Sequence, residues 1–293
     1  MLRLAEHDWR PRAAAHEARI ARLTEGHLAR RDRKERHPVI DFLFDYYGHT
    51  PGKLRRWSPG AGIVLEGAAD DPCASWTYMH VDAGSGAVSV DVDAFLAVRG
   101  RGLAFIRQIL ERTLERPIHT GCFGLHEWAM VYRQPEERRH PTWPLRLGAE
   151  GTNAVVEGAT LACSHFDATR FFTAEALPRN TLSPSRDTML ELEQPGCLHA
   201  GMDLYRWAFK LAPAMPSDLV ADAFELALDI RTLDMQASPY DLTALGYAPV
   251  AIETAAGKRG YAARQRTFGE RGNVLRRRLL GAITAVQPRT NVD

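Results

Sequence analysis

Cysteine is scarce in this chain, with four residues in a sequence of 293. So few cysteines cannot form the disulfide framework of a small secreted protein, which excludes that class. Long apolar runs are missing as well: a membrane span requires about 20 apolar residues, and even the apolar stretch 39–47 contains Asp41 and Asp45. The first 30 residues mix Arg, Glu and His and lack the apolar centre of a signal peptide. We therefore expect a cytoplasmic protein that does not enter a membrane.

An excess of one charge is also absent. The chain has 37 Lys and Arg residues against 36 Asp and Glu residues, a formal net charge of +1. This balance excludes a polycation that coats nucleic acid through net charge alone. The sequence also lacks a glycine-rich phosphate loop, a Cys-x-x-Cys pair, a His-Glu-x-x-His motif and a Gly-x-Ser-x-Gly motif. No motif therefore assigns the chain to one of these catalytic classes.

A predominantly helical pattern is present instead. Hydrophobic residues make up 45% of the chain, and their spacing of three and four residues predicts helices over most of the sequence. Glycines separate short β-prone runs within 60–93, and further such runs occur at 155–156 and 161–166. We expect a mainly α protein, about half helix, with a minor mixed β region, which is an α+β fold. The helices are expected at 9–30, 39–47, 95–114 with a break at Gly100 and Gly102, 125–132, 202–207, 217–235 and 258–282.

The first 36 residues differ in composition from the rest. The helix over 9–30 leads into a charged run at 30–36, which is most simply a solvated helix end. Residues 37–293 show no repeat, low-complexity stretch or flexible linker. We predict an N-terminal helix and basic run over 1–36, followed by a single globular domain over 37–293.

Some acids and histidines occur in apolar settings, where an unpaired charge is unfavourable. His126 and Glu127 lie in the apolar and aromatic segment 121–132, and Glu127 is either functional or neutralised by a buried arginine. Asp234 continues the apolar stripe of the helix over 217–235, and is either catalytic or paired with Arg231. The other acids of that helix form a stripe that is most simply its solvated face: Asp218, Asp222, Glu225 and Asp229.

Two further groups combine histidine with aspartate. On a strand, the two-residue alternation would place Cys163, His165 and Asp167 on one face, either as a functional group or as a core histidine held by a carboxylate. His199 and Asp203 are four residues apart and share one helical face, which is either a pocket wall or a polar outer face.

Histidine closely follows cysteine at three places. The pairs are Cys122 with His126, Cys163 with His165, and Cys197 with His199. Thiolate and imidazole together favour zinc or a redox metal over magnesium, whereas buried free cysteines are also common in protein cores. None of the spacings is that of a known zinc finger.

Eight segments of the chain resemble bacterial proteins, mostly from actinobacteria, that carry the label 3-methyladenine DNA glycosylase. The segments are 37–47, 54–57, 121–133, 163–172, 193–200, 202–205, 237–242 and 249–254. The resemblance covers most of the chain, roughly 37–280. It implies a DNA-repair glycosylase that excises alkylated, N-methylated purines, with DNA as its partner and without a cofactor.

Such an enzyme flips the base out of the stack and stabilises a sugar cation with a carboxylate. A methylated purine is cationic, so aromatic faces attract it. The basic runs at 30–36, 53–56, 138–140 and 258–278 are available to contact phosphates. Under this interpretation the candidate catalytic residues are Asp234, Glu127, Asp203 and His199. The candidate substrate-binding residues are Trp57, Trp128, Tyr132, Tyr205 and Trp207.

The alternative is a mostly helical metal-dependent enzyme that acts on a small molecule. Zinc or iron would then be bound where histidines and carboxylates converge. The candidate ligands are His126, His165, Asp167 and His199, with Glu127 and Asp203 beside them. A non-catalytic binding protein is a third class and would use the same aromatic pocket without turnover. Buried acids and histidines need partners, so the functional interpretations predict that the segments 126–127, 165–167, 199–203 and 234 meet at one pocket. The sequence leaves the oligomeric state open.

Overall fold

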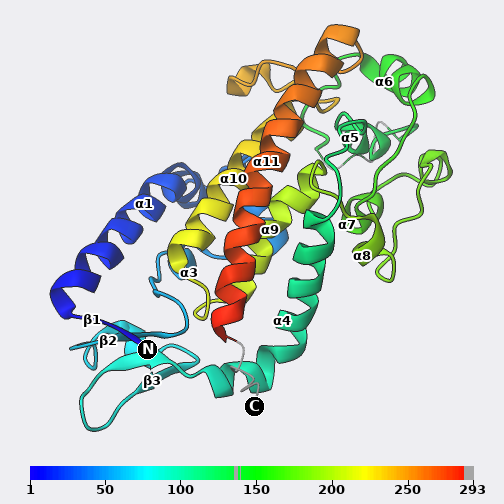
Figure 1. Ribbon diagram of the computed structural model, residues 1–293. Helices are drawn as coiled ribbons and strands as arrows, with labels where there is room; N and C mark the ends of the chain where they lie inside the picture. The colour runs from blue at the N-terminus through cyan, green and yellow to red at the C-terminus, as the bar shows by residue number, and fades with distance from the viewer. Residues whose placement is uncertain (135–137, 139, 287–293) are drawn as a thin grey trace.

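The structure is a computed structural model that describes residues 1–134, 138 and 140–286 (Figure 1). This described part of the chain contains eleven α-helices and four short strands. The helices are α1 (Glu6–Asp32), α2 (Phe42–Tyr47), α3 (Pro51–Leu54), α4 (Val92–Leu114), α5 (Leu125–Ala129), α6 (Gly148–Glu157), α7 (Phe166–Thr169), α8 (Met189–Leu192), α9 (Leu198–Lys210), α10 (Ser217–Gln236) and α11 (Ala255–Val286). The strands are β1 (Leu2–Leu4), β2 (Ile63–Leu65), β3 (Met79–Val81) and β4 (Val88–Val90). The predicted fold class, mainly helical with a minor mixed sheet, is confirmed.

Helices α9, α10 and α11 pack side by side at the centre of the molecule, and α4 packs against α11 (Figure 1). The apolar spacing of α10 buries Leu226, Ile230 and Leu233 completely or almost completely. Helix α9 approaches α10 closely at Gly201, where a Cβ atom would lie 2.6 Å from Ile230 Cδ1. Polar side chains on the facing parts of α9 and α10 are consequently removed from solvent.

The acidic stripe of α10 is covered by arginines from distant parts of the chain. Arg19 of α1 donates hydrogen bonds to Asp222 at 2.7 Å and to Glu225 at 2.9 Å. Arg278 of α11 also pairs with Asp222. The expectation of a merely solvated face is therefore wrong for part of the stripe, because partners some 50 to 200 residues away in sequence are not visible in the local pattern.

The four strands form one mixed sheet in the order β1-β2-β4-β3. Strand β1 runs parallel to β2, and the other two neighbouring pairs are antiparallel. The sheet packs on a small apolar cluster of its own, which includes Trp9, Trp57 and Leu65. Figure 1 shows the sheet at one end of the molecule, whereas α5 and α6 lie towards the other end.

The expected break in the helix over 95–114 is absent. Helix α4 runs continuously from Val92 to Leu114. Gly100 and Gly102 both face open space, so each only lowers helix propensity, by about 1 kcal/mol relative to alanine. Burial of Leu103, Ile106 and Ile109 in the core outweighs this loss.

The two strand-like runs within 145–172 are not strands either. Residues 155–156 lie inside α6, and Leu161 forms an isolated bridge with Asn180. The Asn180 amide bonds the backbone of Cys163, accepting from its N–H at 2.7 Å and donating to its carbonyl at 2.9 Å, so these groups do not pair with a strand. His165 then directly precedes α7, and the expected strand face of Cys163, His165 and Asp167 does not form.

None of the helices within the described ranges is both long enough and apolar enough to cross a membrane.

Candidate functional site

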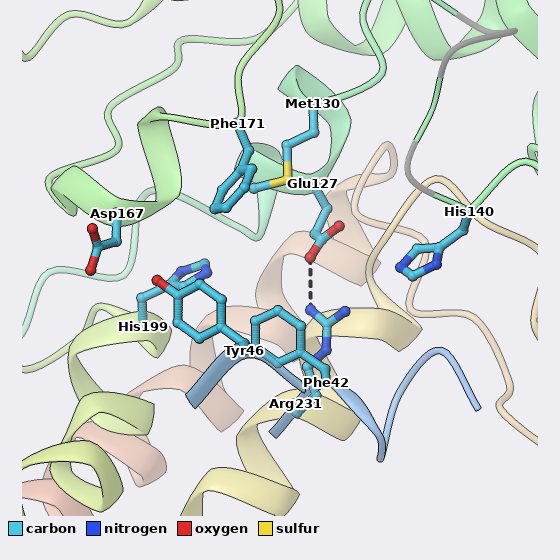
Figure 2. A pocket seen from close by; sticks show the side chains of 9 residues that line it. All are labelled: Phe42, Tyr46, Glu127, Met130, His140, Asp167, Phe171, His199 and Arg231. Atoms are coloured by element: carbon cyan, nitrogen blue, oxygen red, sulfur yellow. Dashed lines mark hydrogen bonds and ion pairs between the residues drawn. The ribbon is translucent and has the colours of Figure 1, made fainter. Parts of the chain in front are cut away.

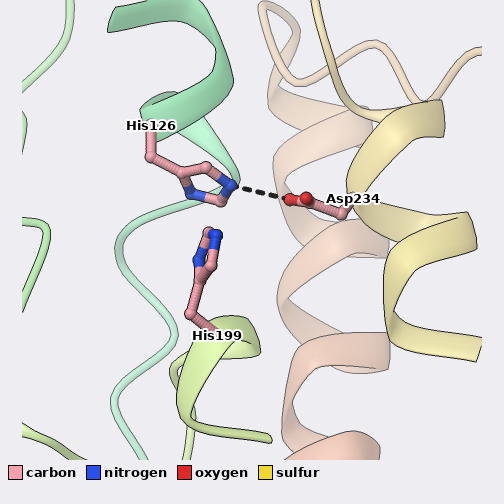
Figure 3. A group of neighbouring side chains, drawn as sticks. All are labelled: His126, His199 and Asp234. Carbon is pink, nitrogen blue, oxygen red and sulfur yellow. Dashed lines mark ion pairs between the residues drawn. The ribbon is translucent and has the colours of Figure 1, made fainter. Parts of the chain in front are cut away.

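Three buried side chains from three helices converge where α5 meets α9 and α10, and we call them the His126 cluster: His126, His199 and Asp234 (Figure 3). One nitrogen or oxygen atom from each lies within 4.8 Å of the other two. His126 Nε2 lies 2.8 Å from Asp234 Oδ1, and the His126 and His199 rings meet edge to face with centroids 4.5 Å apart. Within the described chain neither His126 Nε2 nor Asp234 Oδ1 has a hydrogen-bond partner of good geometry. The two buried atoms thus form an ion pair whose angles differ from those of a well-aligned hydrogen bond.

The two histidines of the His126 cluster differ in charge. Burial lowers the pKa of His126, but the Asp234 carboxylate outweighs burial and raises this pKa well above the ordinary value. Burial, together with His126 and His165 nearby, places the pKa of His199 well below the ordinary value. His199 is therefore neutral at pH 7, the form in which imidazole binds metals.

A buried arginine holds the carboxylates around this cluster. Arg231 Nη1 donates to Glu127 Oε1 and to Asp234 Oδ2, both at 2.8 Å (Figure 2 shows the Glu127 pair). Burial opposes the ionisation of Glu127, but Arg231 and His126 outweigh it and hold the pKa of Glu127 at about 2. Both interpretations that named an arginine partner, for Glu127 and for Asp234, are confirmed. Because Arg231 engages only Oδ2 of Asp234, Oδ1 remains directed at His126.

A second group of three buried side chains, which we call the His165 cluster, contains His165, Glu193 and Asp203. His165 Nε2 lies 3.7 Å from Glu193 Oε1 and 3.5 Å from Asp203 Oδ2. Of these atoms, His165 Nε2 and Glu193 Oε1 have no hydrogen-bond partner in the described part of the chain. The other oxygen of Asp203 accepts a hydrogen bond from the Tyr47 hydroxyl at 3.0 Å. The oxygen of Asp203 that faces His165 also accepts a hydrogen bond from Arg206 at 3.4 Å, so both oxygens of this carboxylate have partners outside the cluster.

The pKa values in the His165 cluster favour a proton shared between the histidine and the carboxylates, or a cation bound among them. Burial raises the pKa of Glu193 to about 7, although His165 opposes the rise. The carboxylates of Asp203 and Glu193 overcome the burial of His165 and raise its pKa. Glu193 and Tyr47 were not identified as site residues from the sequence. For Glu193 the reason is that Glu191 and Glu193 flank the same leucine, and the local pattern does not show which of the two is buried.

The two clusters adjoin each other. The rings of His165 and His199 stack with centroids 5.2 Å apart and planes 26° apart. The structure therefore brings the segments 126–127, 165–167, 199–203 and 234 together, as predicted, through His126, Glu127, His165, His199, Asp203 and Asp234. The predicted single pocket is not formed by all of them, because only Glu127 and His199 of these six residues line the small pocket beside them.

A small pocket opens beside the clusters. Its volume of about 20 Å³ is room for one water-sized molecule. His199 and Asp167 line one side, and Glu127 and Arg231 line another (Figure 2). Aromatic and sulfur-containing side chains complete the wall: Phe42, Tyr46, Met130 and Phe171, with His140 opposite.

Asp167 stands apart from both clusters. Arg206 Nη1 lies 2.8 Å from Asp167 Oδ2 and 3.4 Å from Asp203 Oδ2. Arg170 pairs with the other Asp167 oxygen at 3.3 Å. Two arginines thus occupy its carboxylate, and the structure places Asp167 at the pocket wall rather than among the converging atoms.

The five candidate substrate-binding aromatics do not line this pocket. Trp128, Tyr132 and Tyr205 are at most 1% exposed. The Trp128 indole donates to the Ala237 carbonyl at 2.8 Å, and the Tyr132 hydroxyl donates to Glu157 at 2.8 Å. Trp57 belongs to the core beneath the sheet, and Trp207 lines a different hollow with Lys210.

The cysteines near these histidines are not among the converging ligand atoms of the described residues. Burial raises the pKa of Cys163 to about 11 and that of Cys197 well above the ordinary value. Cys163 Sγ instead contacts the His165 carbonyl at 3.9 Å. Both thiols are protonated at pH 7 and pack as small apolar groups.

Comparison of the chain with protein-family models, with curated proteins and with solved structures finds no match.

Proposed function

We propose that this protein is a metal-dependent enzyme that acts on a small molecule. The single observation that carries the proposal is the convergence of six buried ligand-type side chains in two adjoining clusters of three. In this proposal His126, His199 and Asp234 bind one zinc or iron ion, and His126 releases its proton when the ion binds. His165, Glu193 and Asp203 form a second site, with one histidine and two carboxylates.

The distances in the His126 cluster support a bound ion. Two ligands that are each about 2.1 Å from one ion lie about 3.0 Å apart at the 90° angle of octahedral coordination and about 3.4 Å apart at the tetrahedral angle. The 2.8 Å between His126 Nε2 and Asp234 Oδ1, which form an ion pair, is close to the octahedral spacing and shorter than the tetrahedral one. In the adjoining His165 cluster, His165 Nε2 and Glu193 Oε1 lie 3.7 Å apart and have no hydrogen-bond partner within the described residues. Buried polar atoms without partners each destabilise a fold by about 1–3 kcal/mol, which favours a ligand that pairs these two atoms.

The ligand types narrow the choice of metal. Two histidines and one carboxylate are the ligands of non-haem iron sites and of catalytic zinc sites. Arg231 fixes Asp234 through Oδ2 as an outer hydrogen-bond partner, and Tyr47 does the same for Asp203. Such partners orient the ligands of metal sites.

The water-sized pocket beside His199 supports catalysis rather than structural binding. A structural zinc site is closed by four protein ligands, whereas a catalytic site keeps an open position. Zinc in this position would activate water, and iron would bind dioxygen. Glu127 and Arg231 line the pocket and would hold or orient this small molecule.

Elemental analysis of the purified protein tests the proposal. We expect up to two equivalents of zinc or iron per chain, with one equivalent lost in Asp234→Asn and in His199→Ala and the other lost in Glu193→Gln. Glu111→Gln, which removes an exposed pair with Arg107, is the matched control and should retain both. A wild type that contains no metal, takes up neither zinc nor iron(II), and melts at the same temperature with and without a chelator would refute the proposal.

The DNA glycosylase implied by the resemblance remains a second prediction. It requires a pocket beside Asp234 that holds a purine between aromatic faces. The pocket there has a volume of about 20 Å³, and the aromatic residues expected to hold the base pack elsewhere. The geometry therefore favours the metal-dependent enzyme.

A further inference from the structure

A second, much larger hollow lies between α3, the C-terminal end of α9 and the segment before β3. Its volume of about 490 Å³ is in the range of small-molecule binding sites. Four cationic side chains line it: Lys53, Arg56, Arg99 and Lys210. Among the described residues that line it, none is an aspartate or a glutamate. The four cations also form no ion pair within the ranges that the structure describes.

The cations lie close enough to influence one another. Burial lowers the pKa of Lys210, and the neighbouring guanidinium groups of Arg206 and Arg99 lower it further. Burial likewise lowers the pKa of His49 to about 4, and Lys210, Arg206 and Lys53 contribute. Like charges held together in this way destabilise the fold unless an anion lies among them.

Aromatic side chains lie beside these cations. Trp76, Tyr78 and Phe209 line the same hollow, and the Arg56 guanidinium lies 5.3 Å from the centroid of the Trp76 ring. Tyr78 has a φ of 69°, a left-handed conformation that is unfavourable for a bulky residue. Strained residues of this kind cluster at ligand-binding sites. The hollow therefore combines aromatic faces with unpaired positive charge.

A neighbouring hollow lies between this one and the pocket of the candidate site. Its volume is about 440 Å³, and it shares Arg99 and Lys210 with the 490 Å³ hollow and adds Arg186 and Arg206. Asp167 lines this neighbouring hollow as well as the water-sized pocket beside His199. A ligand that occupies both hollows would thus end one side chain away from the water-sized pocket.

We infer that the two hollows together bind a small aromatic polyanion of the nucleoside phosphate class. The phosphates would lie among Lys53, Arg99 and Lys210, and the planar ring would stack beside Trp76. The limited volume of the hollow and its four-cation lining favour a small molecule over a nucleic-acid strand, which requires a groove that continues beyond one or two nucleotides. This inference does not depend on a bound metal, because neither cluster contributes a residue to the 490 Å³ hollow.

Calorimetric titration of the full chain with ATP, in the presence of a chelator of metal ions, tests the inference. We expect saturable binding of one ATP per chain. Adenosine and inorganic triphosphate should each bind at least about tenfold more weakly, because each lacks half of the recognised groups. Arg99→Gln and Lys210→Gln should each weaken ATP binding about tenfold or more, and Trp76→Leu should do so by loss of stacking. Arg101→Gln on α4, an exposed arginine that does not line the hollow, is the control and should bind as the wild type does.

Melting curves without ligand separate loss of binding from loss of folding. Arg99→Gln should melt no lower than the wild type, because it removes one of the mutually repelling cations. Absence of ATP binding would overturn the inference, as would equal weakening by Arg101→Gln. A single-stranded oligonucleotide that binds more tightly than ATP through the same arginine and lysine would also overturn it, since the site would then be a nucleic-acid surface. Because the titration is made without metal, failure of the metal proposal would not change its result.

Discussion

Replacement of Glu127 by glutamine isolates the contribution of the buried ion pair with Arg231. The substitution keeps the volume of the side chain and removes its charge, while Arg231 retains its bond to Asp234. A pKa of about 2 for Glu127, against 4.5 for an ordinary glutamate, corresponds to about 3 kcal/mol of stabilisation at pH 7. Removal of one partner from a buried pair typically destabilises a protein by about 3–5 kcal/mol. We therefore expect Glu127→Gln to lower the free energy of unfolding by about 3 kcal/mol.

Urea unfolding of metal-free wild type and variant at several pH values measures this difference. The lowered pKa of Glu127 stabilises the folded state fully above pH 4.5, and this contribution is lost as the pH falls towards 2. The difference between wild type and variant should therefore be constant from pH 6 to 8 and about 1 kcal/mol smaller at pH 3.5. Glu111→Gln, in which an exposed pair is removed, should change the free energy of unfolding by only about 0.2–0.5 kcal/mol.

A Glu127→Gln variant as stable as the wild type would refute the assignment of this carboxylate as one half of a buried pair. So would a difference that does not change between pH 7 and pH 3.5. Metal content provides an independent readout, because Glu127 is not among the converging ligand atoms and its replacement should leave bound metal unchanged.

Three further predictions concern other parts of the molecule. Burial and nearby cations lower the pKa of His49 to about 4, so the stability of the wild type should fall as the pH drops from 6.5 through 4. Melting curves of His49→Phe, which keeps the stack on Phe209, should show a smaller fall between pH 7, 5 and 4. An equal fall in the variant would be inconsistent with this pKa. Cys163→Ser should leave metal content unchanged by elemental analysis, because the Cys163 thiol is protonated at pH 7, whereas loss of metal would identify it as a ligand. If the protein is a glycosylase, it should bind duplex DNA, and the logarithm of the binding constant should fall with the logarithm of the salt concentration with a slope of magnitude about 3–6. Asp234→Asn should then abolish release of methylated purine from alkylated DNA while DNA binding persists. Binding without base release by the wild type would contradict this activity.

The long helices could be predicted from sequence because each buries a continuous apolar stripe. Helix α10 follows the spacing of Leu226, Ile230 and Leu233, and these residues are buried as expected. The short elements could not be predicted in this way. Residues 155–156 are β-branched and yet helical, and the backbone groups of Cys163 are occupied by the Asn180 side chain. In both places tertiary contacts decide a structure that local propensity leaves open.

Part of the candidate site could also be predicted from the sequence, because some of its polar residues have apolar neighbours along the chain. His126, His199 and Asp234 occur in apolar surroundings, which marks a polar side chain as needing a partner. Glu193 carries no such mark, because the groups around its buried carboxylate, His165 and Asp203, come from other segments of the chain. The expected roles of Trp128 and Tyr205 also depended on accessibility, which periodicity does not report. Sequence thus identified residues that require partners, but not the partners themselves.

The central claim is that a metal ion lies between His126, His199 and Asp234. Anomalous X-ray diffraction at the zinc and iron absorption edges, from crystals of protein purified without chelator, tests this claim most directly. We predict an anomalous peak about 2.0–2.2 Å from a nitrogen of each histidine and from Asp234 Oδ1. A well-ordered structure in which His126 and Asp234 contact each other directly, with no anomalous peak between them after crystals are soaked in zinc or iron(II), would contradict it.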